Sequence, residues 1–148
     1  MLPKIEFNKN KVSTINCFKD QEVIDAVHKK GLPKAYLPKV EETYGKVIFP
    51  ITAGDYPYSF ASIALSMDGK MAYPNRPEGV LVAKSNTLNE NGALTDFYVL
   101  NFLRAYADVV INGTKTLVSE PNMWMTVYDD DLIAERHEYL GKRRGAPL

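Results

Sequence analysis

Ser66, Asp68 and Lys70 place a hydroxyl, a carboxylate and an amine around Gly69, directly after an apolar run at residues 58–65. The carboxylate can hold a hydrogen-bond donor of a ligand, and the lysine can bind a phosphate or a carboxylate. Ligands of open α/β sheets gather outside the carboxyl ends of the strands, where such a run would present these residues. The same side chains also fit a turn in which serine and aspartate only bond their own backbone. Both interpretations are compatible with the spacing.

A second group, Gly113, Thr114, Lys115 and Thr116, follows the apolar run 108–111 and opens a predicted helix. Glycine lets the chain turn sharply into a helix, whose first free N–H groups attract anions. The helix dipole contributes roughly 0.3–1 kcal/mol, and each charge-assisted hydrogen bond adds about 1.5–3 kcal/mol. The group therefore suits a pyrophosphate or a ribose phosphate, although a glycine turn before an ordinary capped helix fits the spacing equally well. Neither a Walker pattern nor G-x-G-x-x-G occurs in the chain.

Alternating strands and helices would position these two groups. Residues 58–65 are apolar at nearly every position, which predicts a strand covered on both faces. Two further strands are predicted at residues 79–83 and 108–111, and helices at residues 94–107, 115–119 and 129–140. This order predicts an α/β fold with a mainly parallel sheet and right-handed crossovers.

Two of these helices carry detailed signals. In the helix 94–107, Phe97, Leu100, Leu103 and Ala107 share an apolar face, which Val99, Phe102 and Tyr106 broaden. Thr95 with Asp96 supplies the expected N-terminal cap and acid. In the helix 129–140, three aspartates begin the first turn and Gly141 ends the helix.

Residues 1–50 differ from the rest, and we expect them to form an N-terminal extension. Their one predicted helix runs from Asp20, a suitable N-cap, to residue 30, before Gly31 and Pro33. Residues 46–49 are a possible edge strand. Residues 51–148 form the main unit, and residues 145–148 resemble the approach to another strand, so we expect its sheet to be incomplete at the C-terminal side.

The composition narrows the class of protein. With 148 residues, the chain can bury one core. Eighteen basic and eighteen acidic side chains cancel, so no overall charge attracts nucleic acid or an anionic membrane. Cys17 is the only cysteine, which excludes an intrachain disulfide and suits a reducing compartment. No apolar stretch is long enough for a membrane span. We expect a cytoplasmic protein without a bound metal.

The motifs together resemble the reductase domain of bacterial riboflavin biosynthesis, in the dihydrofolate-reductase-like superfamily. The matching segments are residues 64–70, 102–105, 108–116 and 120–121, and the resemblance spans just under half of the chain. It implies a dihydrofolate-reductase-like, mainly parallel sheet flanked by helices. It also implies an enzyme that uses NADPH to reduce the ribosylamino ring of a phosphorylated pyrimidine intermediate to a ribitylamino chain.

The motifs and the resemblance together suggest roles for individual residues. Six are expected to bind NADPH: Ala64, Gly113, Thr114, Lys115, Thr116 and Glu120. Ser66 and Arg104 are expected to bind the small-molecule substrate, and Asp68 and Lys70 to lie at the reaction centre. Hydride transfer mainly requires alignment of the nicotinamide with the substrate.

The chain departs from the family at residues 75–79, which lack the serine–tryptophan pair that contacts substrate and cofactor there. This departure motivates an alternative function, a nucleotide- or phosphate-binding module without catalysis. A third interpretation is a structural fragment that self-associates. Whether the chain is an enzyme or a fragment, we expect it to form a homodimer or to be completed by a missing C-terminal half of the domain.

Overall fold

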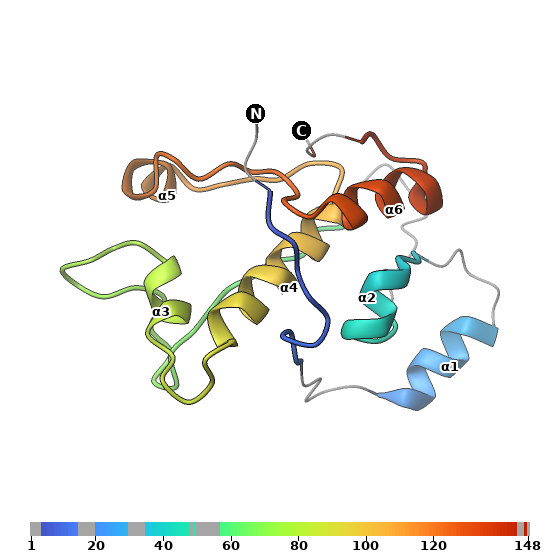
Figure 1. The fold of residues 1–148 in the computed structure, drawn as a ribbon, viewed down its shortest axis with the longest axis horizontal. Coiled ribbons are helices and arrows are strands. Elements are labelled where there is room, and N and C mark those ends of the chain that lie inside the picture. Colours follow the sequence, from blue (N-terminus) through green and yellow to red (C-terminus); the bar gives the residue numbers. More distant parts are fainter. Residues whose placement is uncertain are drawn as a thin grey trace.

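The computed structural model describes residues 4–14, 20–29, 35–47, 49, 57–144 and 147. The helices within these ranges are α1 (Gln21–Lys29), α2 (Pro38–Thr43), α3 (Val80–Lys84), α4 (Gly92–Tyr106), α5 (Thr114–Ser119) and α6 (Asp130–Leu140). In Figure 1, α4 crosses the middle of the molecule, with α2 and α6 on one side and α3 and α5 at the opposite end.

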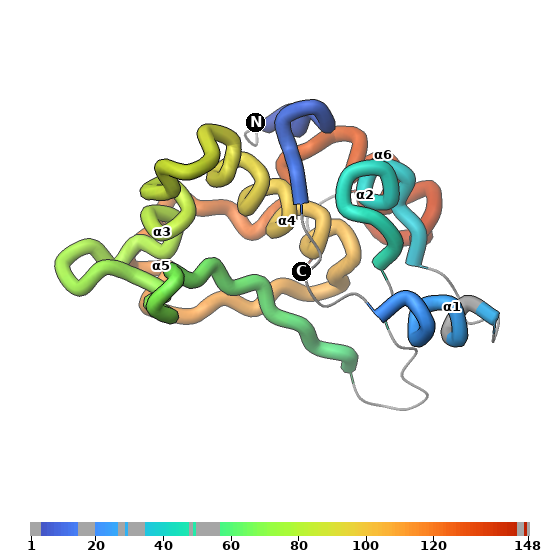
Figure 2. The backbone as a smooth tube through the Cα atoms, turned by 90° about the horizontal axis from the view of Figure 1, so that it is seen from below, coloured from blue at the N-terminus to red at the C-terminus, as the bar shows by residue number. Residues whose placement is uncertain are grey.

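The prediction of a parallel α/β sheet of the dihydrofolate-reductase type is wrong. Over the described ranges the structure is 41% helix and 2% strand, without a β-ladder, and its one isolated bridge joins Tyr73 to Arg76. Residues 58–65 and 108–111 are stretched out, as Figure 2 shows, but they make no backbone hydrogen bonds to each other. Their apolar side chains favour strands, but a strand exists only where a neighbouring backbone pairs with it.

The short strand predicted at residues 79–83 is also wrong, because the chain forms α3 there and packs it against α4. An apolar run of this length fits a strand or a buried helical turn equally well. The sequence analysis also missed α2, which begins with Pro38 at its first position. Proline is compatible with that position because the first helical N–H groups have no partner within the helix.

The remaining predicted helices are confirmed within a few residues. In α1, Asp20 Oδ1 accepts a hydrogen bond from the Val23 amide at 3.1 Å, as expected for an N-cap. Asp129 caps α6, and Gly141 ends it with a φ of 65°. The cap predicted for α4 is wrong, since α4 begins at Gly92 with Asn91 as its N-cap.

The core is built around α4. Its buried residues are Tyr98, Asn101, Phe102, Arg104, Ala105 and Tyr106. Of the predicted apolar stripe, Phe102 and Tyr106 are therefore buried, whereas Phe97, Val99 and Leu103 are only partly buried. The segment 4–14 crosses this helix in Figure 1. The buried residues of the predicted extension belong to the same cluster: Phe7, Val12, Leu37 and Val40.

Arg136 of α6 joins the end of α4 to the end of its own helix. Its Nη1 donates to the carbonyl oxygens of Ala105 and Ala107, both at 2.6 Å, and its Nε donates to the Arg143 carbonyl at 3.0 Å. The last carbonyls of an α-helix have no partner within the helix. A buried guanidinium therefore caps α4.

None of the helices in the described ranges is both long enough and apolar enough to cross a membrane. Several sequence predictions fall outside those ranges. They concern Cys17, the helix stop at Gly31 and Pro33, and most of the segment 145–148.

Candidate functional site

Residues 66–70 form a tight turn held by its own backbone and by Ser66. The Gly69 amide donates to the Ser66 carbonyl at 2.9 Å, and the Ser66 amide donates to the Lys70 carbonyl at 3.0 Å. Ser66 Oγ accepts from the Lys70 amide at 2.9 Å and donates to Asp68 Oδ1 at 2.5 Å. Gly69 has a φ of 81°, which side-chain-bearing residues rarely adopt.

Asp68 and Lys70 form an exposed ion pair across this turn. The hydrogen bond from Lys70, and then the one from Ser66, lower the pKa of the Asp68 carboxyl group. Asp68 is therefore ionised at neutral pH and is a poor proton donor. These contacts fit the alternative interpretation, in which the polar side chains only stabilise the turn itself. Both charged groups nevertheless lie at the surface, where a ligand can reach them. Ala64, two residues before the turn, is half-buried.

The start of α5 leaves its backbone donors open. Gly113 is the N-cap and provides no side-chain hydrogen bond. Within the described part of the chain, the amides of Thr114, Lys115 and Thr116 have no acceptor. Thr114 and Lys115 are exposed, and a Cβ built on Gly113 would meet only Thr116 Oγ1, at 4.0 Å. Neither space nor backbone conformation requires glycine here, and its missing side chain lets a ligand approach the amides.

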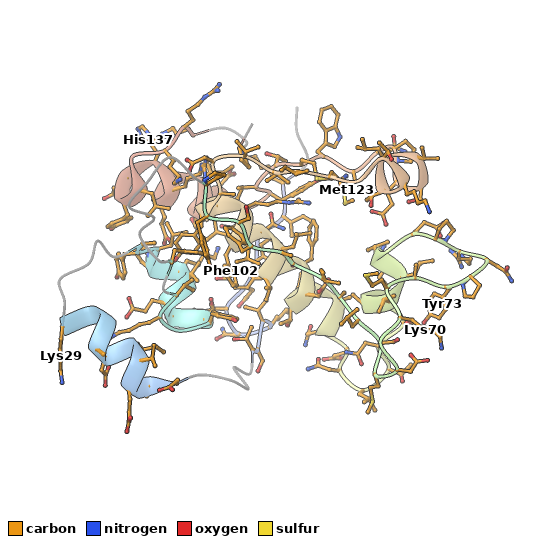
Figure 3. The ribbon with its side chains drawn as sticks, turned by 180° about the vertical axis from the view of Figure 1, so that it is seen from behind. Lys29, Lys70, Tyr73, Phe102, Met123 and His137 are labelled. Carbon is orange, nitrogen blue, oxygen red and sulfur yellow. The ribbon has the colours of Figure 1, made fainter. Side chains whose placement is uncertain are left out.

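The two predicted groups lie at the same end of the molecule. Figures 1 and 2 both place α3, which comes after the 66–70 turn in the chain, at the same end of the molecule as α5. One hydrogen bond joins these segments, from the Val80 amide of α3 to Glu120 Oε1 just after α5, at 3.2 Å. In Figure 3, Lys70 lies at this end, whereas Lys29 of α1 lies at the other.

Arg104, predicted to bind substrate, is not part of this group. It is 4% exposed, and its Nη1 donates to the carbonyls of Thr126 at 3.1 Å and Trp124 at 3.4 Å. Burial lowers the pKa of its guanidinium group. Its Nε has no partner among the described residues. Arg104 thus attaches the segment 124–126 to α4, and a substrate could reach it only if this segment moved.

A second feature, missed by the sequence analysis, is a pocket of about 620 Å³ between the N-terminal segment, α2 and α6. Its five lining carboxylates are those of Glu6, Glu42, Asp131, Glu135 and Glu138. Its two lysines are already paired, Lys9 with Glu42 and Lys39 with Asp129 and Asp131. None of the predicted site residues lines this pocket. Because carboxylates repel phosphates, the pocket is unsuited to a phosphorylated cofactor.

One wall of the pocket shows how α2 and α6 are held together. Both carboxylate oxygens of Glu135 accept from the Lys39 amide, at 3.0 and 3.1 Å. Burial of Glu135 raises the pKa of its carboxyl group. Burial by itself lowers the pKa of Lys39, but hydrogen bonds to Asp129 and Asp131 outweigh this effect and raise it. These groups already serve the packing of the two helices.

Comparison with known proteins gives no assignment. No family model matches the chain. No curated protein and no solved structure matches it either. Across the described residues, no group of three or more histidine, cysteine, aspartate or glutamate side chains is placed to hold a metal ion. The resemblance to the reductase family therefore rests on the motifs quoted above.

Proposed function

We propose that this chain is an NADPH-dependent reductase acting on a phosphoribosylamino-pyrimidine of riboflavin biosynthesis, or on a close relative of that substrate. The observation that supports the proposal is the hydrogen bond between the Val80 amide of α3 and Glu120, just after α5, at the end of the molecule where both helices lie. The 66–70 turn and α5 lie at this same end of the molecule. The resemblance implies that the turn belongs to the reaction centre and that the start of α5 binds the cofactor.

The phosphates of NADPH would bind at the start of α5. Lys115 and the hydroxyl of Thr114 are exposed there, next to backbone amides without an acceptor. A helix of six residues has only a small dipole, so the lysine charge provides most of the attraction. The bound cofactor supplies the hydride, while Asp68 and Lys70 would orient the reacting groups. An ionised Asp68 suits orientation better than proton donation.

Titration of the protein with NADPH and with NADH, followed by cofactor fluorescence, tests this proposal. We expect saturable NADPH binding that Lys115→Ala weakens. Lys29→Ala is the matched control, since this exposed lysine lies at the other end of the molecule and should leave binding unchanged. Absence of binding for both cofactors would refute the proposal. Oxidation of NADPH in the presence of the phosphoribosylamino-pyrimidine is the test of catalysis.

The burial of Arg104 favours a second candidate function, a nucleotide- or phosphate-binding module without catalysis. Its guanidinium is engaged with backbone carbonyls of residues 124 and 126 and is withdrawn from solvent. A substrate phosphate would then not be bound by the Arg104 guanidinium, although the resemblance assigns it that role. Binding of NADPH without any pyrimidine reduction would support this candidate, and measurable turnover would exclude it.

A further inference from the structure

Two asparagines of this chain are followed directly by glycine, Asn91 by Gly92 and Asn112 by Gly113. At such a pair the amide nitrogen of the glycine can attack the asparagine side chain, because glycine has no Cβ that hinders the approach. The attack requires a glycine nitrogen without another partner and a backbone that can rotate to bring this nitrogen to the asparagine Cγ. The two pairs differ in both respects.

The pair Asn91–Gly92 is held in place at the start of α4. The Gly92 amide donates a hydrogen bond to the Asn89 carbonyl at 3.0 Å, and the Asn91 amide donates to Asn89 Oδ1 at 2.8 Å. The Asn91 carbonyl accepts from the Thr95 amide at 2.9 Å, within the first turn of this 15-residue helix. Attack by the Gly92 nitrogen must therefore break a hydrogen bond and unwind the start of α4.

The pair Asn112–Gly113 lacks these restraints. Within the described part of the chain, the Gly113 amide has no acceptor, and the backbone of residues 109–112 makes no hydrogen bond. Asn112 Nδ2 is buried but also has no hydrogen-bond partner among these residues. Asn112 as a whole is partly exposed, so water can reach it. Rotation of its side chain toward the Gly113 nitrogen breaks no hydrogen bond of either nitrogen atom.

We propose that Asn112 is a site of self-modification, at which the Gly113 nitrogen converts the asparagine to aspartate and isoaspartate. The Gly113 nitrogen loses its proton and forms a bond to Asn112 Cγ. The bond from Cγ to Nδ2 breaks, and ammonia leaves with that proton. Water then opens the resulting cyclic imide at either of its carbonyl groups, which gives aspartate or isoaspartate. The reaction consumes one water and releases one ammonia for each asparagine, and nothing is oxidised or reduced.

The modification adds a negative charge directly before Gly113, the N-cap of α5. A carboxylate without a partner is unfavourable in a buried position, so we expect the modified side chain to turn toward solvent. The modification itself is independent of the proposed reductase function. Only its consequence for NADPH, a weaker attraction of the cofactor phosphates to α5, rests on that function.

Peptide mapping by mass spectrometry tests the modification after the folded protein has been incubated at neutral and at mildly alkaline pH. Replacement of the amide by a carboxylate changes the mass of the peptide, and an isoaspartate-specific methyltransferase detects the second product. We expect Asn112 to react at least about tenfold faster than Asn91, because the start of α4 must first open locally. The rate should rise with pH, since the attacking nitrogen must lose its proton. In urea, where neither pair is held, both should react at similar rates.

Gly113→Ala is a variant in which the attack is hindered but the fold should persist. Gly113 has a φ of −74°, and a Cβ at this position would meet only Thr116 Oγ1, at 4.0 Å. The variant should modify Asn112 much more slowly and Asn91 at the same rate as the wild type, and circular dichroism shows whether it is folded. An Asn112 that stays intact, or that reacts no faster than Asn91 in the folded protein, would overturn the proposal. So would a difference between the two asparagines that persists in urea, or a folded Gly113→Ala variant that modifies Asn112 as fast as the wild type.

Discussion

Asp129 connects three parts of the chain through one carboxylate, and its replacement by alanine should be strongly destabilising. The residue is 1% exposed. Its Oδ1 accepts from the Leu132 amide at 2.9 Å, which caps α6. Its Oδ2 accepts from the Phe7 amide at 3.1 Å and from Lys39 Nζ at 2.7 Å. Asp129→Ala removes all of these contacts at once.

The loss can be estimated contact by contact. An N-cap side chain contributes about 1 kcal/mol. A buried amide without an acceptor, here that of Phe7, costs about 1–3 kcal/mol. Removing one partner of a buried ion pair costs about 3–5 kcal/mol, but Asp131 remains as a second partner of Lys39 and reduces this contribution. Because the contributions overlap, we expect a total loss of about 4 kcal/mol, a large part of the 5–15 kcal/mol typical of a domain.

Urea unfolding of the wild type and three variants measures this loss. Asp130→Ala is the control, because its side chain is 74% exposed and, among the described residues, forms only a surface ion pair with Lys4. It should cost less than about 1 kcal/mol. Asp129→Asn keeps an acceptor for the Leu132 amide but loses the charge, so its stability should lie between those of wild type and Asp129→Ala. If Asp129→Ala and Asp130→Ala lower the free energy of unfolding equally, the buried contacts of Asp129 do not stabilise the fold as argued.

Three other predictions concern separate parts of the molecule. Arg136→Met leaves the last carbonyls of α4 without a donor and should lower the free energy of unfolding by about 3 kcal/mol. Arg143→Met, at an exposed side chain, is the control and should change it little. Similar urea midpoints for the two variants would contradict the capping role. Lys115→Ala should weaken NADPH binding about tenfold and NADH binding less, if Lys115 contacts the 2′-phosphate; an equal loss for both cofactors would refute that contact. Burial raises the pKa of Asp96, so the stability linked to its protonation is present at low pH and is lost as the pH rises through the folded-state pKa. Asp96→Asn should therefore stabilise the protein at neutral pH, with a gain that disappears in acid; a gain independent of pH would exclude this cause.

The sequence predicted best those elements whose signals lie within the element itself. The cap at Asp20, the aspartates that begin α6 and the stop at Gly141 are local features, and α1 and α6 were located from them. Strands depend on a partner elsewhere in the chain, so the apolar runs at 58–65 and 108–111 indicated a propensity and not a pairing. The run at residues 80–84 became helical through packing on α4, which its composition does not reveal.

The candidate site was predictable to a similar degree. The turn at residues 66–70 was anticipated because serine, aspartate and glycine interact over a few residues. The environment of Arg104 was not, since its partners are carbonyl groups some twenty residues away. A charged residue on a helix is usually exposed, and only the fold shows that this one faces the segment 124–126. The pocket lined by carboxylates was missed for the same reason, because its walls come from distant segments.

The contacts of Asp129 also set the order of events during synthesis. Phe7 precedes Asp129 by 122 residues, and Lys39 precedes it by 90. While the ribosome is still making the intervening chain, the early part of the protein has no carboxylate with which to close its core. The ring of Phe7 can pack on Phe97 and Tyr98 once α4 has been made, but its amide finds its acceptor only when Asp129 emerges, so this part of the core is completed late in synthesis.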